Sequence, residues 1–414
     1  MDSGTSHSVI SPLNLADLDF WARPVEERDK TFASLRAIDE KVFCPRGDGP
    51  GFYALTRYDQ VVDASRNPRV FSSEPTSVSL DDPPPAVQEL MGSMIGLDDP
   101  RHARLRRIVA RGFTPRMIQK TEADVVALAR GIVDAFIDHG PGDFVTEVAM
   151  PLPLEIICTM MGVPREVRPE VVAATNILIQ ATGDPEYEAP HGRDRGIMLF
   201  EQLSYLQGLG AELARERRAQ PADDLVTALV TADIDGEALS DVDVGKFFGL
   251  LVTAGNETTR NALSHALALL TEHPDQRDLL LADLDERLPA MVEEVVRYAT
   301  PVTWMRRNVT TDVDLCGQTY HAGDRVIMYY ISANQDESVF TDPYRFDITR
   351  SPNPHVGFGA PGPHFCLGAH LARREITVML RELFTRLPGL HATAPPVRQR
   401  ASFVNAITSL PCAF

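Results

Sequence analysis

The sequence predicts a predominantly α-helical fold of the α+β class, with a long central helix and a small β-sheet region. Helical patterns succeed one another between about residues 76 and 299, and the longest runs without interruption over residues 240–273. Strand-like segments lie on either side, at about residues 30–75 and 300–414. With 414 residues and 44% hydrophobic content, the chain is long enough for a large core that encloses a cofactor, or for more than one domain.

The first hundred residues combine short elements with a long loop. A helical pattern covers residues 26–39, and residues 52–55 and 61–62 indicate strands. Residues 76–100 begin as a Pro- and Asp-rich loop and continue as an apolar stretch over residues 89–96. Long loops with apolar tips inside compact enzymes are often binding elements, so we expect this loop to meet a ligand.

From residue 99 to about residue 210 the pattern is helical, with stops at Gly and Pro clusters, and a further helix is expected over residues 222–232. The helix predicted over residues 240–273 begins with a Ser-x-x-Asp cap at Ser240 and Asp243. At 1.5 Å per residue, roughly 34 residues span about 50 Å, so this helix is expected to cross the interior. A helix over residues 279–298 and strands over residues 309–315, 325–331 and 403–411 complete the chain.

Charge and cysteine content narrow the class of protein. A formal net charge of −18 disfavours nucleic acids and anionic membrane surfaces as partners, because both repel an acidic protein. No apolar run approaches the ~18 residues that a membrane span requires. The 5 cysteines are scattered without a pairing pattern, which is typical of a reducing compartment. We therefore expect a cytoplasmic protein without a membrane span.

The most informative stretch is the glycine-rich loop of residues 355–368, which carries Cys366 and runs into a helical pattern. Its glycines allow positive φ and close approach to a flat partner, and the first N–H groups of the helix favour an anion such as a thiolate. A thiolate serves a redox couple, a nucleophile or a metal. The absence of a second nearby cysteine argues against zinc and against a CxxC redox pair, whereas a single thiolate suits the axial position of a haem. A buried structural cysteine is the alternative.

A second unusual stretch lies in the middle of the long helix. Ala254, Gly255, Glu257 and Thr258 stand where a core helix normally carries Leu or Val. The small residues leave a gap for a diatomic ligand or a water molecule, and a threonine hydroxyl that bonds the i−4 carbonyl opens or bends the helix locally. The alternative is a helix kink whose polar groups are satisfied. If this stretch faces the cysteine loop, the two together border one pocket.

Both stretches resemble motifs of the cytochrome P-450 family. Phe358, Gly362, His364, Cys366 and Gly368 match positions of its haem-binding signature, although Phe358 and Cys366 are one residue further apart than in the commonest form. Residues 254–259 are similar to its oxygen-activation motif. The resemblance extends over nearly the whole chain. It implies one cytochrome P-450 domain over residues 1–414, with β-rich edges at about 30–75 and 300–414 around a helical core at about 76–299.

The resemblance implies haem b as the cofactor and the Cys366 thiolate as the axial ligand of its iron, with Phe358 and Gly368 in the same site. A haem also carries propionates, which need cationic partners. The residues that match propionate-binding positions of the family are His102, Arg106, Arg307 and His364. The choice between Arg307 and its neighbour Arg306 stays open at this point.

The same resemblance implies catalytic roles in the long helix. Thr258 would hold dioxygen by a hydrogen bond, and Glu257 would supply protons with the help of ordered water. Ala254 and Gly255 would line the space above the iron. A relay of this kind is needed because splitting dioxygen consumes protons in a pocket that otherwise excludes water.

Glu294 and Arg297 form an i, i+3 pair, which on any helix can be an ordinary surface pair. Their position before Pro301, together with the segment 342–346 downstream, resembles the Glu-Arg-Arg structural triad of the family. The resemblance therefore implies that Glu294, Arg297 and Arg345 form a buried scaffold behind the cysteine loop.

Residues 18–22, 92–102, 154–158 and 254–261 look like the mycobacterial methyl-branched-lipid ω-hydroxylases. This likeness implies a monooxygenase that inserts one oxygen atom from O2 into an unactivated C–H bond, at or near the end of a branched lipid, an isoprenoid or a sterol side chain. Tailoring oxidation of a macrolide or terpenoid is an alternative. Candidate lining residues, each of which could equally belong to the core, are Met94, Ile95, Ile177, Phe248, Val252, Val302, Trp304 and Phe403.

The chain contains neither a dinucleotide-binding fingerprint nor a flavin domain, so electrons from NAD(P)H are expected to arrive through external redox proteins. A small acidic ferredoxin with its reductase is the expected donor. Arginines crowd residues 101–116 and recur at Arg373 and Arg374, where outward-facing ones suit an acidic partner, although such runs are often only solvated helix faces. A non-catalytic haem-thiolate sensor or carrier is a function of another class, which Glu257 and Thr258 disfavour.

Overall fold

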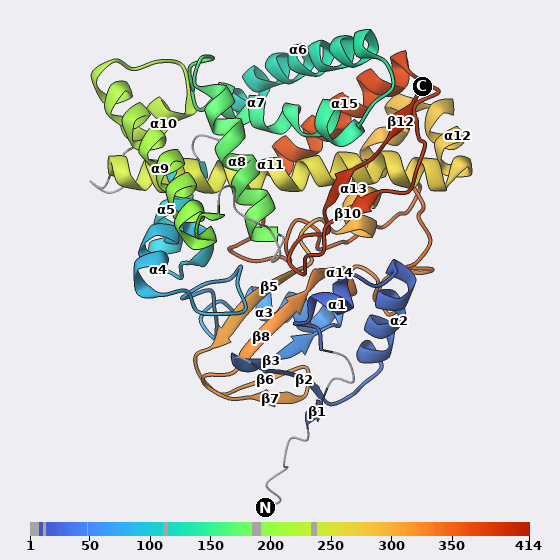
Figure 1. Ribbon diagram of the computed structural model, residues 1–414. Coiled ribbons are helices and arrows are strands. Elements are labelled where there is room, and N and C mark those ends of the chain that lie inside the picture. Colours follow the sequence, from blue (N-terminus) through green and yellow to red (C-terminus); the bar gives the residue numbers. More distant parts are fainter. Residues whose placement is uncertain (1–7, 11–13, 48, 111–114, 184–191, 233–237) are drawn as a thin grey trace, which may run out of the picture.

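The computed structural model describes residues 8–10, 14–47, 49–110, 115–183, 192–232 and 238–414. Most helices gather in one layer, and the sheet lies beside that layer together with the N-terminal helices (Figure 1). The fold is predominantly helical and of the α+β class, as the sequence predicts. None of the helices within these ranges is both long and apolar enough to cross a bilayer.

Helix α11 (Asp241–Glu272) is the central element and confirms the long helix predicted over residues 240–273. Ser240 caps it: Ser240 Oγ accepts the Asp243 N–H at 3.1 Å, and the Asp243 carboxylate accepts the Ser240 N–H at 3.0 Å. The helix runs the length of the helical layer (Figure 1). Its neighbours are α7 (Pro151–Met160), α9 (Arg195–Ala219), α13 (Leu284–Ala299) and α15 (Ala369–Arg386).

The remaining helices surround α11 or cover the sheet. They are α1 (Leu18–Trp21), α2 (Val25–Arg36), α3 (Tyr58–Arg66), α4 (Pro85–Met91), the 3-10 turn η1 (Met94–Gly96), α5 (Arg101–Ala110), α6 (Pro115–His139), the π-helical turn η3 (Val145–Ala149), α8 (Arg168–Gly183), α10 (Leu225–Thr231), α12 (Pro274–Ala282) and α14 (Tyr330–Ala333).

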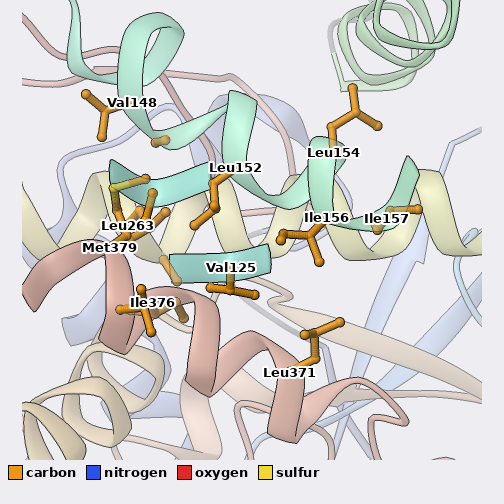
Figure 2. Packing of buried hydrophobic residues seen from close by; sticks show 14 of the residues in the cluster. Val125, Val148, Leu152, Leu154, Ile156, Ile157, Leu263, Leu371, Ile376 and Met379 are labelled. Carbon is orange, nitrogen blue, oxygen red and sulfur yellow. The ribbon is translucent and has the colours of Figure 1, made fainter. Parts of the chain in front are cut away.

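The main hydrophobic core lies where α11 meets α6, α7 and α15 (Figure 2). Val125 of α6, Ile156 of α7, Leu263 of α11 and Met379 of α15 are fully buried there. Ile376 of α15 belongs to the same core and also borders the large cavity described below. The core therefore fixes the start of α15, immediately after the cysteine loop, relative to α11.

Strands from both ends of the chain form a 6-stranded sheet in the order β1-β2-β3-β8-β5-β4. The parallel pairing of β3 (Gly49–Leu55) with β8 (Arg325–Tyr329) joins the two β-rich regions that the sequence separates. The other strands of this sheet are β1 (Ser8–Ile10), β2 (Lys41–Arg46), β4 (Phe71–Ser72) and β5 (Trp304–Val309). The short antiparallel pairs are β6 (Val313–Leu315) with β7 (Gln318–Tyr320), β9 (His391–Ala392) with β12 (Cys412–Ala413), and β10 (Val397–Arg398) with β11 (Ile407–Ser409).

The strand predicted at residues 61–62 is wrong, because Val61 and Val62 lie in helix α3. Two apolar residues are too short a run to distinguish a strand from the buried face of a helix. The backbone N–H of Arg57 donates to the Gln60 side chain at 3.2 Å and helps to start this helix, which buries Val61 and Ala64 one turn apart.

Other predicted elements have different boundaries. The helix expected over residues 279–298 is divided between α12 and α13 at Asp283, whose carboxylate accepts the Glu286 N–H at 3.3 Å. The strand expected over residues 309–315 is interrupted between β5 and β6, and the one over residues 325–331 ends at Tyr329, where α14 begins. Within residues 403–411 the strand β11 covers Ile407–Ser409.

Candidate active site

Cys366 lies at the end of the loop that precedes α15 and borders a large cavity. Its backbone N–H donates to the Phe358 carbonyl at 2.9 Å, which closes the loop on itself. Gly359 has a φ of 88°, and a Cβ on Gly357 would lie 2.6 Å from a side-chain atom of Val296. A larger residue fits neither position without strain, so the positive φ and the close approach predicted for this loop are both present.

The neighbours of the Cys366 thiol act on it in opposite directions. Cys366 is exposed to the cavity, yet the surrounding protein atoms partly desolvate its thiol and raise its pKa, whereas a hydrogen bond from the Gly368 backbone and the positive charges of Arg106 and Arg373 lower that pKa. Gly368 is the N-cap position of α15, so the start of the helix does offer a donor to the sulfur. A bound metal ion removes the thiol proton outright and so reverses the effect of burial.

Ala254, Gly255 and Thr258 of α11 line the same cavity as Cys366, so the two unusual stretches do face one pocket. Thr258 Oγ1 donates to the Ala254 carbonyl at 3.0 Å, which is the i−4 bond expected of a threonine in this position. Asn256 between them is fully buried, and neither polar atom of its amide bonds to a described residue. The alternative of a simple kink requires every polar group of this stretch to be hydrogen-bonded. The Asn256 amide does not meet that requirement.

Glu257 lies beside this wall without bordering the cavity. Its Oε1 atom is 3.6 Å from Arg260 Nη2, too far for a hydrogen bond, and bonds to no other described residue. Burial raises the pKa of the Glu257 carboxyl to about 7, and the charge of Arg260 opposes that shift. Glu257 can therefore take up or release a proton near neutral pH, one residue away from Thr258.

The cavity and its opening to solvent together contain about 1510 Å³ of space free of protein atoms, and the cavity walls are mainly apolar. Among the predicted lining residues, Met94, Ile95 and Val302 do border it. Met94 and Ile95 belong to η1, in the apolar part of the long loop over residues 76–100. That loop therefore lies beside the cavity, where a ligand-binding element is expected.

The other predicted lining residues do not reach the cavity wall. Phe248 and Val252 are fully buried in the main core, where Phe248 packs against α9. Trp304 and Phe403 pack edge to face, with 5.0 Å between ring centroids, in the cluster beside the sheet. Ile177 of α8 is half-buried and lies outside the wall. The core alternative is the one observed for Phe248, Val252, Trp304 and Phe403, whereas Ile177 belongs neither to the cavity wall nor to a hydrophobic core cluster.

Sequence reasoning missed Phe247, Leu250 and Leu251, which border the cavity from α11. They stand at positions i−7, i−4 and i−3 from Ala254, the spacing of one helix face. Because Ala254 is already expected at the cavity, counting back along that face selects Phe247 rather than Phe248.

Four polar residues expected at one cofactor site do share the cavity wall, namely His102, Arg106, Arg307 and His364. The rings of His102 and His364 lie 4.0 Å apart between centroids. Arg106 donates to the Phe365 carbonyl, beside Cys366. His102 Nε2 is buried and bonds to no described residue.

Arg306 and Arg307 are both buried in β5 but point to different partners. Arg306 Nη2 lies 2.6 Å from Asp82 Oδ1, and Arg306 does not border the cavity. Arg307 does border it, has no carboxylate of a described residue within ion-pair distance, and donates to the Arg306 carbonyl at 2.7 Å. Of the two arginines, only Arg307 therefore borders the cavity.

Comparison with known proteins relates this geometry to a family. The family model described as cytochrome P-450 matches residues 201–388. Over 412 residues the chain is 46% identical to the methyl-branched lipid omega-hydroxylase of Mycobacterium tuberculosis, and the match covers 97% of this chain and 94% of that protein. The chain belongs to the cytochrome P-450 family.

Two further similarities agree with this assignment. The steroid C26-monooxygenase of Mycolicibacterium smegmatis is 38% identical over 402 residues, with 95% of this chain and 91% of that protein covered. A solved cytochrome P-450 of Mycobacterium marinum, in complex with pseudoionone, superposes with a TM-score of 0.89 at 41% identity and covers 100% of this chain and 99% of its own. This cytochrome P-450 is therefore a monooxygenase that uses a haem-thiolate and O2.

The residues at the cavity fit a haem. Cys366 supplies a thiol, and Ala254 and Gly255 supply small side chains in the same cavity. The unpaired Nε2 of His102 and the Arg307 guanidinium suit the carboxylates that a haem carries. Within the described ranges, no group of three or more His, Cys, Asp and Glu side chains could hold a different metal ion.

The buried triad of this cytochrome P-450 differs from the predicted one. Glu294 and Arg297 are both fully buried and joined by two hydrogen bonds of 2.8 Å. The third arginine is Arg350, whose Nε lies 3.2 Å from Glu294 Oε2, and not Arg345. Arg345 is exposed and contributes only its backbone carbonyl, which accepts from Arg297 and Arg350. The prediction of Arg345 is wrong because the chain folds back after it and brings Arg350 to the carboxylate.

A second acid–base cluster lies on the cysteine side of the cytochrome P-450. Glu293 accepts from Arg373 Nη2 at 2.8 Å and lies 3.0 Å from His355 Nε2, while His355 Nδ1 accepts the Gly357 N–H at 3.1 Å. Although burial opposes the shift, the hydrogen bonds from Arg373 and His355 lower the pKa of Glu293 to about 2. Arg373 also lies 4.2 Å from the centroid of the Phe358 ring. The cluster thereby connects α13 to both sides of the cysteine loop.

The arginines expected to meet a redox partner differ in exposure and in whether they form ion pairs. Arg101 and Arg107 are exposed on α5. Arg373 and Arg374 are about one-third exposed and pair with Glu293 and Glu122. Within the same run, Arg111 and the side chain of Arg116 lie outside the described residues.

Glu375 of α15 also borders the cavity, and no sequence pattern predicts this, since acidic residues are common in helices. It is fully buried, and burial raises the pKa of its carboxyl to about 8. The side chain therefore stays neutral at pH 7.

Proposed function

We propose that this cytochrome P-450 is a cytoplasmic hydroxylase of long, apolar, branched chains, which it oxidises at or near a terminal carbon. The substrate class comprises branched lipids, isoprenoids and sterol side chains. The observation that carries the proposal is the large, mainly apolar cavity in which the small residues Ala254 and Gly255 share a wall with Cys366. The similarity to a methyl-branched lipid omega-hydroxylase and to a steroid C26-monooxygenase supports this substrate class.

Product analysis tests the proposal. The purified enzyme, supplied with a ferredoxin and its reductase, is offered a branched fatty acid, an isoprenoid, a sterol and a macrolide. We expect terminal or near-terminal alcohols from the first three, identified by mass spectrometry. Oxidation of the macrolide alone, or oxidation in the middle of the chains, would contradict the proposal.

In this proposal Cys366 holds the haem iron as a thiolate, the Phe358 carbonyl fixes the Cys366 backbone, and the Gly368 N–H donates to the sulfur. When bound, the haem activates O2 so that one oxygen atom enters a C–H bond and the other leaves as water. The residues that bind its propionates are His102, Arg106, Arg307 and His364. The engagement of Arg306 with Asp82 supports Arg307 as the member of the Arg306–Arg307 pair that binds a propionate.

The residues of α11 at and beside the cavity have a separate role, which is to hold and deliver protons. Thr258 presents a hydroxyl at the cavity, and its bond to the Ala254 carbonyl orients it. Glu257 provides an exchangeable proton in the next position. The unpaired amide of Asn256 supports an ordered water in this stretch, because buried polar groups rarely stay unbonded.

Thr258→Ala tests the hydroxyl. We expect the variant to keep the optical spectrum of the wild type but to divert electrons from product to hydrogen peroxide, because the proton-transfer step that the hydroxyl assists should slow by about 10²-fold or more. Product per NAD(P)H should therefore be at least several-fold lower. Peroxide and product are measured together. Unchanged coupling would remove Thr258 from this role, and Thr253→Ala, on the same helix but outside the cavity wall, serves as the control.

The raised pKa of Glu257 predicts a pH dependence. Below about 7 the carboxyl carries the proton that it delivers, so the fraction of electrons that forms product should fall as pH rises through about 7. Glu257→Gln cannot release a proton and should give low, pH-independent coupling. By linkage, the same group stabilises the fold fully below pH 4.5 and loses that contribution as pH rises to about 7. A flat coupling profile in the wild type would contradict the assignment.

Electrons are proposed to come from NAD(P)H through a reductase and a small acidic ferredoxin. The exposed Arg101 and Arg107, together with the partly exposed Arg373 near the cysteine loop, support an acidic partner on that side. An attraction of this kind weakens with salt, so the reduction rate should fall as ionic strength rises.

A further inference from the structure

A smaller pocket adjoins the main cavity at the start of α11, with about 330 Å³ of space free of protein atoms, part of which is open to solvent. Met94 and Phe247 belong to the walls of both, so the two spaces lie next to each other across these side chains. Leu105 and Val109 of α5 add further apolar surface. The smaller pocket is therefore built like an apolar extension of the larger one.

Lys246 is the basic side chain in this smaller pocket. It is half-buried, and no carboxylate of a described residue lies within ion-pair distance of its ammonium. Asp243 borders the same pocket, but its carboxylate already accepts from the Ser240 N–H at 3.0 Å and from the Ser240 hydroxyl at 2.7 Å. Among the described residues, Lys246 thus has a positive charge without a fixed carboxylate partner, beside an apolar space.

We propose that Lys246 binds the carboxylate of a long-chain branched fatty acid whose other end lies in the main cavity. The inference rests on the proposed function and narrows its substrate class from apolar chains to chains with an anionic head. It also gives a physical reason for oxidation at the far end, because the fixed head keeps the first carbons away from Cys366.

Helix geometry supports the required length. Ala254 follows Lys246 by eight residues on the same helix, which corresponds to about 12 Å of rise. An extended chain advances about 1.2 Å per bond, so about ten bonds separate a head at Lys246 from a carbon beside Ala254. Long-chain acids have this length, and short ones do not.

The side chains between the two spaces fit the passage of a chain. Met94 is unbranched and flexible, so it can repack around a ligand at little energetic loss. A cation beside apolar walls favours a molecule that combines an anionic head with an apolar chain.

The test compares an iso-methyl-branched dodecanoic acid, whose terminal carbon lies about ten bonds from its carboxyl carbon, with its methyl ester. Both are titrated into the ferric holoenzyme, and Kd is read from the shift of the Soret band. The wild type is expected to bind the acid about tenfold more tightly than the ester, because a charge-assisted hydrogen bond is made only with the acid. Lys246→Gln should abolish this preference while leaving the ester Kd unchanged, and Lys246→Arg should retain it. Lys30→Gln, which changes an exposed lysine of α2, is the matched control.

The outcomes separate the two proposals. Equal affinity of the wild type for acid and ester would overturn the role of Lys246, and so would an equal loss of affinity for both ligands in Lys246→Gln. Terminal hydroxylation of the ester would still support the proposed function in either case. Failure of the wild type to bind either ligand would overturn both. As a second readout, Lys246→Gln should shift the oxidation of the acid from the terminal carbon toward in-chain positions, but leave the position unchanged for the ester.

Discussion

Glu294→Ala is expected to lower the free energy of unfolding by about 3–5 kcal/mol, because it leaves a buried charge without its partner. The Glu294 carboxylate accepts from Arg297 and Arg350, from the Asp347 N–H at 3.0 Å and from Asn353 at 3.1 Å. Arg297 is itself fully buried, so removal of the acid strands its guanidinium. Since domains are stable by only about 5–15 kcal/mol, we expect much of the variant to unfold or to lose haem.

Matched arginine variants make this prediction specific. Arg350→Ala should be strongly destabilising, whereas Arg345→Ala should change stability by less than about 0.5 kcal/mol, as is usual for an exposed side chain. Denaturant unfolding and haem content, measured together, report both effects. A Glu294→Ala protein with full haem content and wild-type stability would contradict the buried scaffold. An Arg345→Ala protein with a lower free energy of unfolding than Arg350→Ala would contradict the observed triad.

Local signals explain which parts of the fold the sequence predicts well. Ser240 and Asp243 are a self-contained cap, so the start of α11 can be identified from neighbouring residues alone. Likewise Gly359 and Cys366 lie in one short loop whose glycine pattern has a direct conformational meaning. In both places the physical cause lies within a few residues of its effect.

The missed features depend on contacts that local sequence does not contain. Phe247 and Phe248 are the same residue type and differ only in their position around the helix axis. Because consecutive residues are rotated by about 100°, choosing the neighbouring residue moves the prediction from the cavity to the core. Arg350 replaces Arg345 because of the path of the loop between them. The pairing of β3 with β8 joins segments more than 200 residues apart in the chain, which strand propensity cannot specify.

Cys366→Ala is expected to abolish hydroxylation while the protein keeps its helical fold. The side chain faces the cavity and fills no core position, so its removal should alter stability little in the absence of haem. The loss arises because the thiolate donates the electron density that favours O–O cleavage. Cys316→Ala is the control, since Cys316 lies beside Asp63 and outside the cavity wall.

The most direct measurement of the central claim is the optical spectrum of the reduced protein with carbon monoxide. The wild type and Cys316→Ala should show the long-wavelength Soret band that marks thiolate-ligated haem, and Cys366→Ala should lack it. A wild-type protein that is full of haem yet lacks this band, or a Cys366→Ala protein that keeps it, would contradict the assignment of Cys366 as the iron ligand.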